Sequence, residues 1–156
     1  MAPWADLLYA CDGDWWDEYI DEARKKCQSE LWAYDFNASE KYGLNRIEGD
    51  TRGKGLGRNG IIHTGGNSGY QAVNLVYLLE AKKIILLGFD MQRTNGKSHW
   101  HGDHPQRLNR TSDMKSWVQK FNNLARDLRE AGIEVINATR ETALDCFKRV
   151  PLEVAL

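Results

Sequence analysis

The sequence predicts an α/β fold with a largely parallel sheet flanked by helices. Short apolar runs alternate with amphipathic helical segments along the chain, which is typical of right-handed crossover units around a parallel sheet. A Gly-rich turn opens one of these helices at residues 65–69. With 156 residues, 42% of them hydrophobic, the chain is long enough to bury the core of one domain. We therefore expect a single α/β domain over residues 1–156.

The first segments alternate between strand and helix. Asp6 to Ala10 is a short apolar run that meets Asp and Gly residues, as a buried strand does where it enters a loop. Between Trp15 and Lys26 apolar residues recur at spacings of three and four, which predicts an amphipathic helix. Leu31 to Phe36 is expected to form a second strand, and Arg46 to Glu48 a weak third.

Asp50 to Gly60 has the composition of a loop. It carries four glycines and three cations and lacks apolar periodicity, so we expect a flexible surface loop. Two interpretations stay open: a solvated linker, and a mobile flap over an anionic ligand.

A helix and a strand follow the Gly-rich turn. Asn67 or Ser68 is the candidate N-cap of a helix that runs to about Leu79. Ile84 to Gly88 follows within five residues and is predicted to be a buried parallel strand.

The C-terminal part contains the clearest helix, Ser112 to Ala131, with Gly132 as its C′ residue. Ile133 to Asn137 is predicted to be a strand and Glu141 to Phe147 a short helix, before Pro151 breaks helical continuity. The whole pattern is Rossmann-like. Such folds usually open with a strand and a Gly-rich phosphate loop, whereas here the first apolar run comes directly after Met1. We therefore expect a sheet that lacks the usual first strand and turn, or a permuted sheet.

Composition limits the partners. The 21 basic and 22 acidic residues give a formal charge of −1, so we expect neither a nucleic-acid partner nor a polybasic membrane anchor. No stretch reaches the roughly 18 apolar residues of a membrane span. The three cysteines are widely spaced and odd in number, which favours reduced thiols and a cytoplasmic location.

The Gly-rich turn is the first candidate site. Gly66 and Gly69 permit close backbone approach, while Asn67 and Ser68 add side-chain hydrogen bonds where a helix dipole favours an anion. These four residues are therefore candidate nucleotide ligands. The turn matches neither the P-loop pattern nor the dinucleotide fingerprint. It could also serve only as a tight turn needed for packing.

Two aspartates follow predicted strands. Asp90 ends the strand Ile84 to Gly88, and Asp12 follows the strand Asp6 to Ala10. Ribose hydroxyls, metals and acceptor groups are commonly held at this edge of a sheet. We expect the two carboxylates to be neighbours if the two strands lie side by side. Alternatively, Asp90 caps the following turn.

A histidine-rich loop is the third candidate. His99, His101, His104 and Asp103 lie within six residues. Imidazole suits proton transfer near neutral pH, so a general base is chemically reasonable here. A metal site that uses the His-x-His spacing is an alternative, as are polar loop residues without chemistry. We expect no metal in the leading interpretation.

The segments GNSGYQAVNLVYLLEAKKIILLGFDM, SHWHGD and GIEVINATRETALDCF, within residues 60–147, resemble the bacterial sialyltransferases of glycosyltransferase family 42. The chain also resembles the 6-hydroxymethylpterin diphosphokinase-like domain family and small bacteriophage-encoded proteins of unassigned function. The first resemblance implies that Asn67, Ser68 and Gly69 contact the nucleotide and that Asp90 lies at the mouth of the site. His99 or a close neighbour such as His101 would then be the base for an acceptor hydroxyl.

In that chemistry a sialyl group moves from a cytidine monophosphate (CMP)-linked donor with inversion, and no metal is required. The second resemblance implies diphosphoryl transfer, for which carboxylates such as Asp12 and Asp90 would hold Mg²⁺. A third hypothesis is a non-catalytic binding or assembly protein that keeps the fold, in which exposed Trp residues or the C-terminal VPLEVAL segment make a homo-oligomeric contact. An unpaired sheet edge would favour such association. The expected ligand is a nucleotide or nucleotide-sugar.

Overall fold

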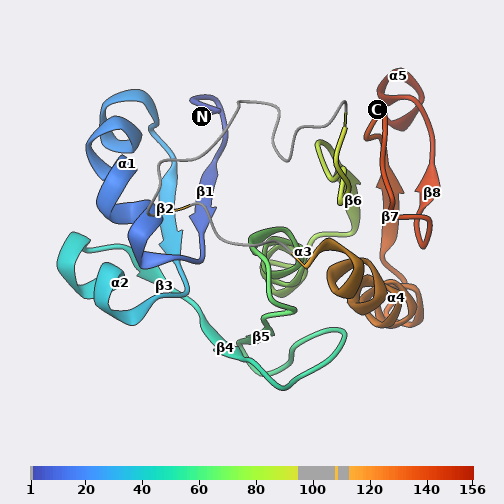
Figure 1. Ribbon diagram of the computed structural model, residues 1–156, viewed down its shortest axis with the longest axis horizontal. Helices are drawn as coiled ribbons and strands as arrows, with labels where there is room; N and C mark the ends of the chain where they lie inside the picture. The colour runs from blue at the N-terminus through green and yellow to red at the C-terminus, as the bar shows by residue number, and fades with distance from the viewer. Residues whose placement is uncertain (1, 95–107, 109–112) are drawn as a thin grey trace.

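The computed structural model describes residues 2–94, 108 and 113–156, and Figure 1 shows their arrangement. The elements along the chain are β1 (Leu7–Ala10), α1 (Gly13–Lys26), β2 (Glu30–Ala33), α2 (Phe36–Tyr42), β3 (Asn45–Arg46), β4 (Glu48–Asp50), β5 (Ile61–His63), α3 (Ser68–Leu78), β6 (Lys83–Leu86), α4 (Met114–Glu130), β7 (Glu134–Asn137), β8 (Lys148–Arg149) and α5 (Leu152–Ala155). This alternation confirms the predicted α/β fold of Rossmann-like pattern.

The strands form small sheets in which every pair is parallel. The strand orders are β1-β2-β3, β4-β5 and β6-β7-β8. The predicted parallel sheet is therefore divided, because no strand among the described residues is hydrogen-bonded to the second edge of β1 or of β6. In Figure 1, β1 and β2 lie on one side of α3, and β6 and β7 lie on the other.

Helix α1 forms as its periodicity predicts. Trp16, Ile20 and Ala23 are buried on one face, and the indole N–H of Trp16 donates to the carbonyl of Ala10 at 3.0 Å. This bond fixes the helix to the end of β1.

The second predicted strand ends earlier than expected, and a helix that the sequence analysis missed follows it. Strand β2 stops at Ala33 because Asp35 begins α2: its Oδ1 accepts a hydrogen bond from the N–H of Ala38 at 2.8 Å. Gly43 ends α2 in the left-handed region, with φ 61°. The weak third strand also differs, since the residues around Ile47 are divided between β3 and β4.

Helix α3 connects the two halves of the core. Its start agrees with the prediction, because the Oδ1 of Asn67 accepts from the N–H of Tyr70 at 2.9 Å. Leu75 packs in a hydrophobic cluster against which side chains of β1 also pack. Val73 packs in a second hydrophobic cluster, which contains residues of β6 and α4. Helix α3 therefore packs against both halves of the core.

The segment between β4 and β5 was predicted to be a flexible surface loop, and the structure corrects this for residues 55–57. The N–H of Gly55 donates to the hydroxyl of Tyr70 at 2.7 Å, and the N–H of Leu56 donates to Asp127 at 3.1 Å. The N–H of Gly57 donates to the Oδ1 of Asn74 at 2.7 Å. We call residues 55–57 the strap, because side chains of α3 and α4 accept hydrogen bonds from its backbone.

Helix α4 buries an apolar face. Phe121, Leu124 and Leu128 are fully buried, and Gly132 follows the helix with φ 74°, as the prediction for its C′ position requires. Strands β6 and β7 then pair in parallel from Lys83 with Glu134 to Leu86 with Asn137. No helix in the described part of the chain is long and apolar enough to cross a membrane.

The short helix predicted for Glu141 to Phe147 does not form. The backbone there makes other hydrogen bonds instead: the N–H of Ala143 donates to the distant carbonyl of Asp90 at 2.8 Å, and the N–H of Leu144 donates to the nearby hydroxyl of Thr142 at 3.0 Å. Burial of Leu144 favours this path. The helix of this region is α5, which begins directly after Pro151, where a fixed φ is tolerated.

The amide of Asn74 generates a prediction about stability. Its Oδ1 accepts from the backbone N–H groups of Gly57 and of His63, at 2.7 and 3.3 Å, and its side chain is fully buried. Replacement of Asn74 by leucine keeps the volume but leaves both donors without an acceptor. We expect a loss of about 2–5 kcal/mol in the free energy of unfolding, measured in urea. The exposed Asn122 on α4 is the control: Asn122→Leu should cost about 0.5 kcal/mol or less. Equal losses in the two variants would refute this role.

Candidate functional site

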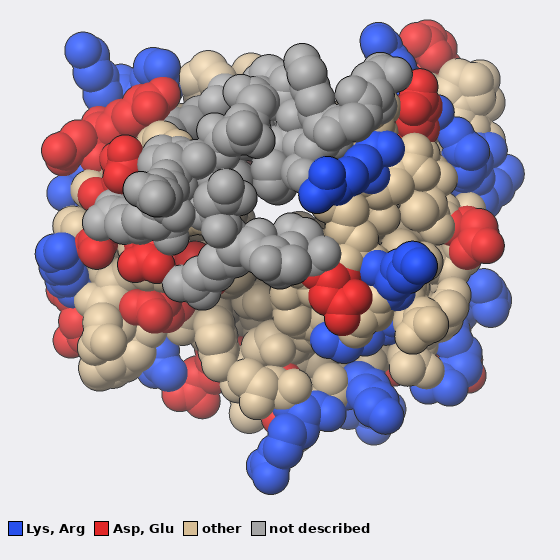
Figure 2. All heavy atoms as spheres, in the orientation of Figure 1, with Lys and Arg blue, Asp and Glu red and all other residues tan. Residues whose placement is uncertain are grey.

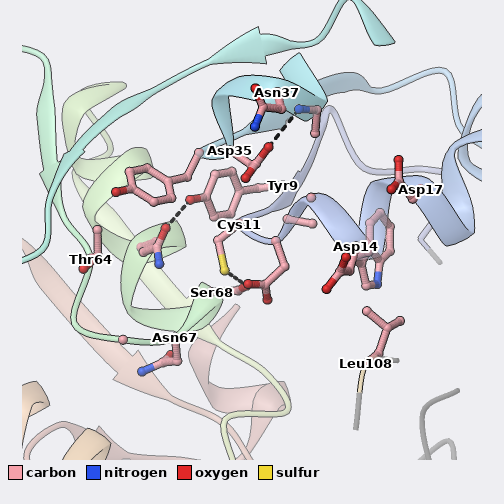
Figure 3. A pocket seen from close by; sticks show the side chains of 18 of the residues that line it. Tyr9, Cys11, Asp14, Asp17, Asp35, Asn37, Thr64, Asn67, Ser68 and Leu108 are labelled. Carbon is pink, nitrogen blue, oxygen red and sulfur yellow. Dashed lines mark hydrogen bonds between the residues drawn. The ribbon is translucent and has the colours of Figure 1, made fainter. Parts of the chain in front are cut away.

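A hollow of about 1090 Å³ lies at the carboxyl ends of β1 and β2, beside the first turn of α3. Figure 3 shows its labelled side chains, which come from segments far apart in the sequence. The carboxyl edge of parallel strands is where open α/β folds hold their ligands. The hollow is therefore the candidate functional site, and its size suits a ligand as large as a nucleotide.

The ends of the two strands contribute carboxylates. Asp12 precedes α1 at its N-cap position, and Asp35 caps α2. A Cβ built on Gly13 would lie 3.0 Å from the Oδ1 of Asp35, so the two strand ends are in close contact. Short loops after adjacent parallel strands thus bring both carboxylates to one wall of the hollow.

The opposite wall is the Gly-rich turn. Gly65 and Gly66 have φ of 57° and 86°, a region that residues with a Cβ rarely adopt. A Cβ on Gly65 would come within 2.3 Å of the ring of Tyr70, so the turn depends on glycine. Asn67 and Ser68 follow directly and begin α3. The turn therefore presents the first N–H groups of an 11-residue helix, which have no intrahelical partner.

A short polar seam joins the two walls. The hydroxyl of Ser68 donates to the Sγ of Cys11 at 3.0 Å, and the hydroxyl of Tyr9 donates to the amide oxygen of Gln71. Burial raises the pKa of the Cys11 thiol to about 12, and burial together with the nearby Cys11 and Asp12 also raises the pKa of Tyr9. Both groups are therefore neutral at physiological pH, so Cys11 is not a nucleophile.

The charges of the hollow are unevenly distributed. Acidic side chains from the N-terminal segment line it, and Lys41 forms a 2.8 Å ion pair with one of them, Asp17. Figure 2 shows acidic side chains gathered on the side of the molecule that carries α1. The strand-end wall consequently favours hydroxyl groups or cations, whereas the start of α3 favours an anion.

The structure brings together most of the predicted nucleotide-binding residues. Asp12, Gly66, Asn67 and Ser68 all line the hollow. Gly69 packs behind it, because a Cβ there would lie 2.9 Å from the ring of Phe89.

The predicted catalytic residues are placed differently. Asp90 lines a second hollow of about 800 Å³ together with Arg140 and Arg149, and the described linings of the two hollows share no residue. The expected contact between Asp12 and Asp90 is therefore not among those described. His99 and His101 lie outside the described residues. Within the described part of the chain, no group of three or more His, Cys, Asp or Glu residues could hold a metal ion.

Sequence analysis missed several residues around the hollow. Asp35 falls within the predicted strand Leu31 to Phe36. However, Asp is a common N-cap residue, and its side chain accepts from the N–H three residues later, here that of Ala38. Trp117 lies in the predicted helix Ser112 to Ala131 and was not among the candidate site residues, yet it lines the hollow. Lys120 was not considered, and its Nζ lies 3.2 Å from a Cβ built on Gly66. The spacing of three residues in α4 places Trp117 and Lys120 on one helix face, which is the signal that could have found them.

The raised pKa of Cys11 predicts how stability depends on pH. Its folded-state pKa of about 12 exceeds its ordinary value of 9.0, so the folded chain holds this proton more tightly. The resulting stabilisation is complete below pH 9.0 and is lost as the pH rises toward about 12. Urea unfolding at about pH 8.5 and at about pH 10.5 gives the loss in the free energy of unfolding between the two pH values. This loss should be smaller in Cys11→Ser than in the wild type, because the variant has no thiol to ionise at this position. Tyr70 and Cys146 also have raised pKa values, of about 12 and about 11, so both proteins should lose stability. Identical losses would contradict the assignment.

Comparison of the chain with models of protein families, with curated proteins and with solved structures found no match. The fold and the geometry of the hollow are therefore the basis for a functional proposal.

Proposed function

We propose that the hollow binds a nucleotide or nucleotide-sugar, and that the chain is a nucleotide-binding domain similar to CMP-sugar-dependent glycosyltransferases. One observation carries this proposal: the start of α3 and the carboxylates at the ends of β1 and β2 line the same hollow. A phosphate and a hydroxyl-rich group are the two chemistries that such walls recognise, and a nucleotide joins them in one molecule.

The phosphate belongs at the Gly-rich turn. The unbonded N–H groups of the first turn and the dipole of α3 favour an anion next to Gly66, Asn67 and Ser68. Among the described residues, this wall carries no carboxylate of its own.

The ribose or sugar belongs at the strand ends. Carboxylate oxygens accept hydrogen bonds from hydroxyls, and each has more than one lone pair. Asp35 already accepts from Ala38 at 2.8 Å and has acceptor capacity left for a ligand. Phosphates beyond the first would meet this acidic wall, so a monophosphate or its sugar ester fits better than a free triphosphate.

For the chemical step, the proposal follows the resemblance to sialyltransferases. The acceptor oxygen bonds to the sugar carbon, the bond from that carbon to the phosphate oxygen breaks, and the nucleoside monophosphate leaves. A base takes the acceptor proton, and His99 is the candidate, with His101 as its neighbour. Asp90 lines the second hollow, and its role in the reaction stays a prediction. The three free cysteines favour the cytoplasm as the site of action.

A second candidate function is Mg²⁺-dependent diphosphoryl transfer. The acidic wall favours it, because carboxylates such as Asp12 are the ligands that Mg²⁺ prefers. Metal dependence of ligand binding separates this candidate from the first.

The proposal predicts ligand-dependent stabilisation. CMP at about a hundred times its dissociation constant should raise the free energy of unfolding by about 2.7 kcal/mol, which a thermal-shift assay detects. We expect this shift in EDTA, and a smaller one for adenosine, guanosine and uridine monophosphates. A shift only with adenosine nucleotides and Mg²⁺ would favour diphosphoryl transfer. The absence of any shift would favour a non-catalytic assembly role, for which light scattering would report a concentration-dependent homo-oligomer.

The variant Ser68→Asp tests the phosphate wall. The variant loses the hydroxyl that donates to Cys11, but a carboxylate in the first turn suits the dipole of α3. The new carboxylate would repel a bound phosphate. Calorimetry should show at least about tenfold weaker binding of CMP and little change for cytidine, which has no phosphate. Unchanged CMP affinity would place the phosphate elsewhere.

A further inference from the structure

We infer that Asn67, Trp117 and Lys120 form an anion site for a single phosphate group between the first turn of α3 and the face of α4. This inference rests on the proposed function, since it names the residues that would hold the phosphate of the nucleotide. It can also be tested on its own, because inorganic phosphate is a sufficient probe.

The geometry converges on Gly66. A Cβ built on this residue would lie 3.2 Å from the Nζ of Lys120 and 3.4 Å from the Nε1 of Trp117. Gly66 itself is exposed and lines the hollow. An ammonium group and an indole N–H are thus both held beside the turn that begins α3. With glycine at position 66, both donors lie close against the backbone of the turn.

Three donors around this point lack partners among the described residues. The Nδ2 of Asn67 is buried and forms no hydrogen bond within this part of the chain, although buried polar groups in proteins are nearly always paired. The indole N–H of Trp117 and the ammonium of Lys120 likewise form no hydrogen bond or ion pair with any residue that the structure describes. In Figure 3 the amide nitrogen of Asn67 points away from Ser68 and Cys11. Three unpartnered donors next to a helix start indicate an anionic acceptor.

The charge count limits the anion. Lys120 supplies one positive charge, and the dipole of α3 adds a partial one. The acidic side chains on the far wall of the hollow, Asp12, Asp14 and Asp35 among them, disfavour further negative charge. The site therefore suits one phosphate, either inorganic phosphate or the phosphate of a nucleoside monophosphate or its ester.

Lys120→Gln and Trp117→Phe test the site. The first removes the charge, and the second removes the indole N–H while keeping a ring. Lys115→Gln is the matched control, because Lys115 is also an exposed lysine of α4 without a contact to Gly66. We expect the dissociation constant for inorganic phosphate to rise at least about tenfold in Lys120→Gln, since the bond is charge-assisted, and to stay unchanged in Lys115→Gln.

A spectroscopic readout reports where the phosphate binds. In the wild-type chain, phosphate should shift the indole N–H resonance of Trp117 in a ¹⁵N-correlated NMR spectrum. The same titration on Lys120→Gln should require much more phosphate for that shift. An unmoved Trp117 resonance at saturating phosphate, or equal affinities in Lys120→Gln and Lys115→Gln, would overturn the inference.

Two ligands separate this inference from the proposed function. If inorganic phosphate binds through Lys120 but no nucleotide binds more tightly than phosphate alone, the anion site stands and the nucleotide proposal fails. If CMP binds with the same affinity to Lys120→Gln and to the wild type, the nucleotide proposal stands and the anion site is wrong. Weaker CMP binding in Lys120→Gln, with cytidine binding unchanged, supports both.

Discussion

The buried amide of Asn74 is the interaction on which the arrangement of this molecule depends. It lies in the middle of α3 and accepts hydrogen bonds from the backbone of the strap and of β5. Tyr70, one turn earlier, exchanges hydrogen bonds with Gly55 in the same strap. Backbone groups in the interior must be paired, so these side chains determine the position of α3 relative to β5. The position of α3 in turn places the Gly-rich turn between the end of β1 and the face of α4.

The candidate site follows from this placement. Because α3 starts opposite the strand-end carboxylates, one hollow is lined by both a helix start and a group of carboxylates. Neither feature alone indicates a function, since helix starts and acidic clusters are common on protein surfaces. Their place in one hollow and their opposite preferences make a ligand with a phosphate at one end and hydroxyls at the other the best chemical match. The neutral Ser68–Cys11 contact between the walls holds them together without adding charge.

Much of the fold could be predicted from local sequence, whereas much of the site could not. The helices with strong periodicity, α1, α3 and α4, lie close to their predicted bounds, because apolar spacing reports burial directly. The helix predicted for residues 141–147 does not form, because Thr142 and Ala143 make hydrogen bonds to Phe89 and Asp90, about fifty positions away in the sequence. The strap was taken for a flexible loop because its ties to Asn74 and Asp127 are also long-range. Lys120 reaches Gly66 only because α4 packs on α3, which no local pattern reveals.

The central claim is that a nucleotide binds in the hollow between the strand ends and the start of α3. The most direct measurement is a ¹⁵N-correlated NMR titration of the chain with CMP, with backbone assignments. The account predicts that the largest amide shifts fall on Gly66 to Gly69, on Asp12 and Gly13, and around Asp35. Shifts confined to the second hollow, around Asp90, Arg140 and Arg149, or no saturable shifts at all, would contradict it.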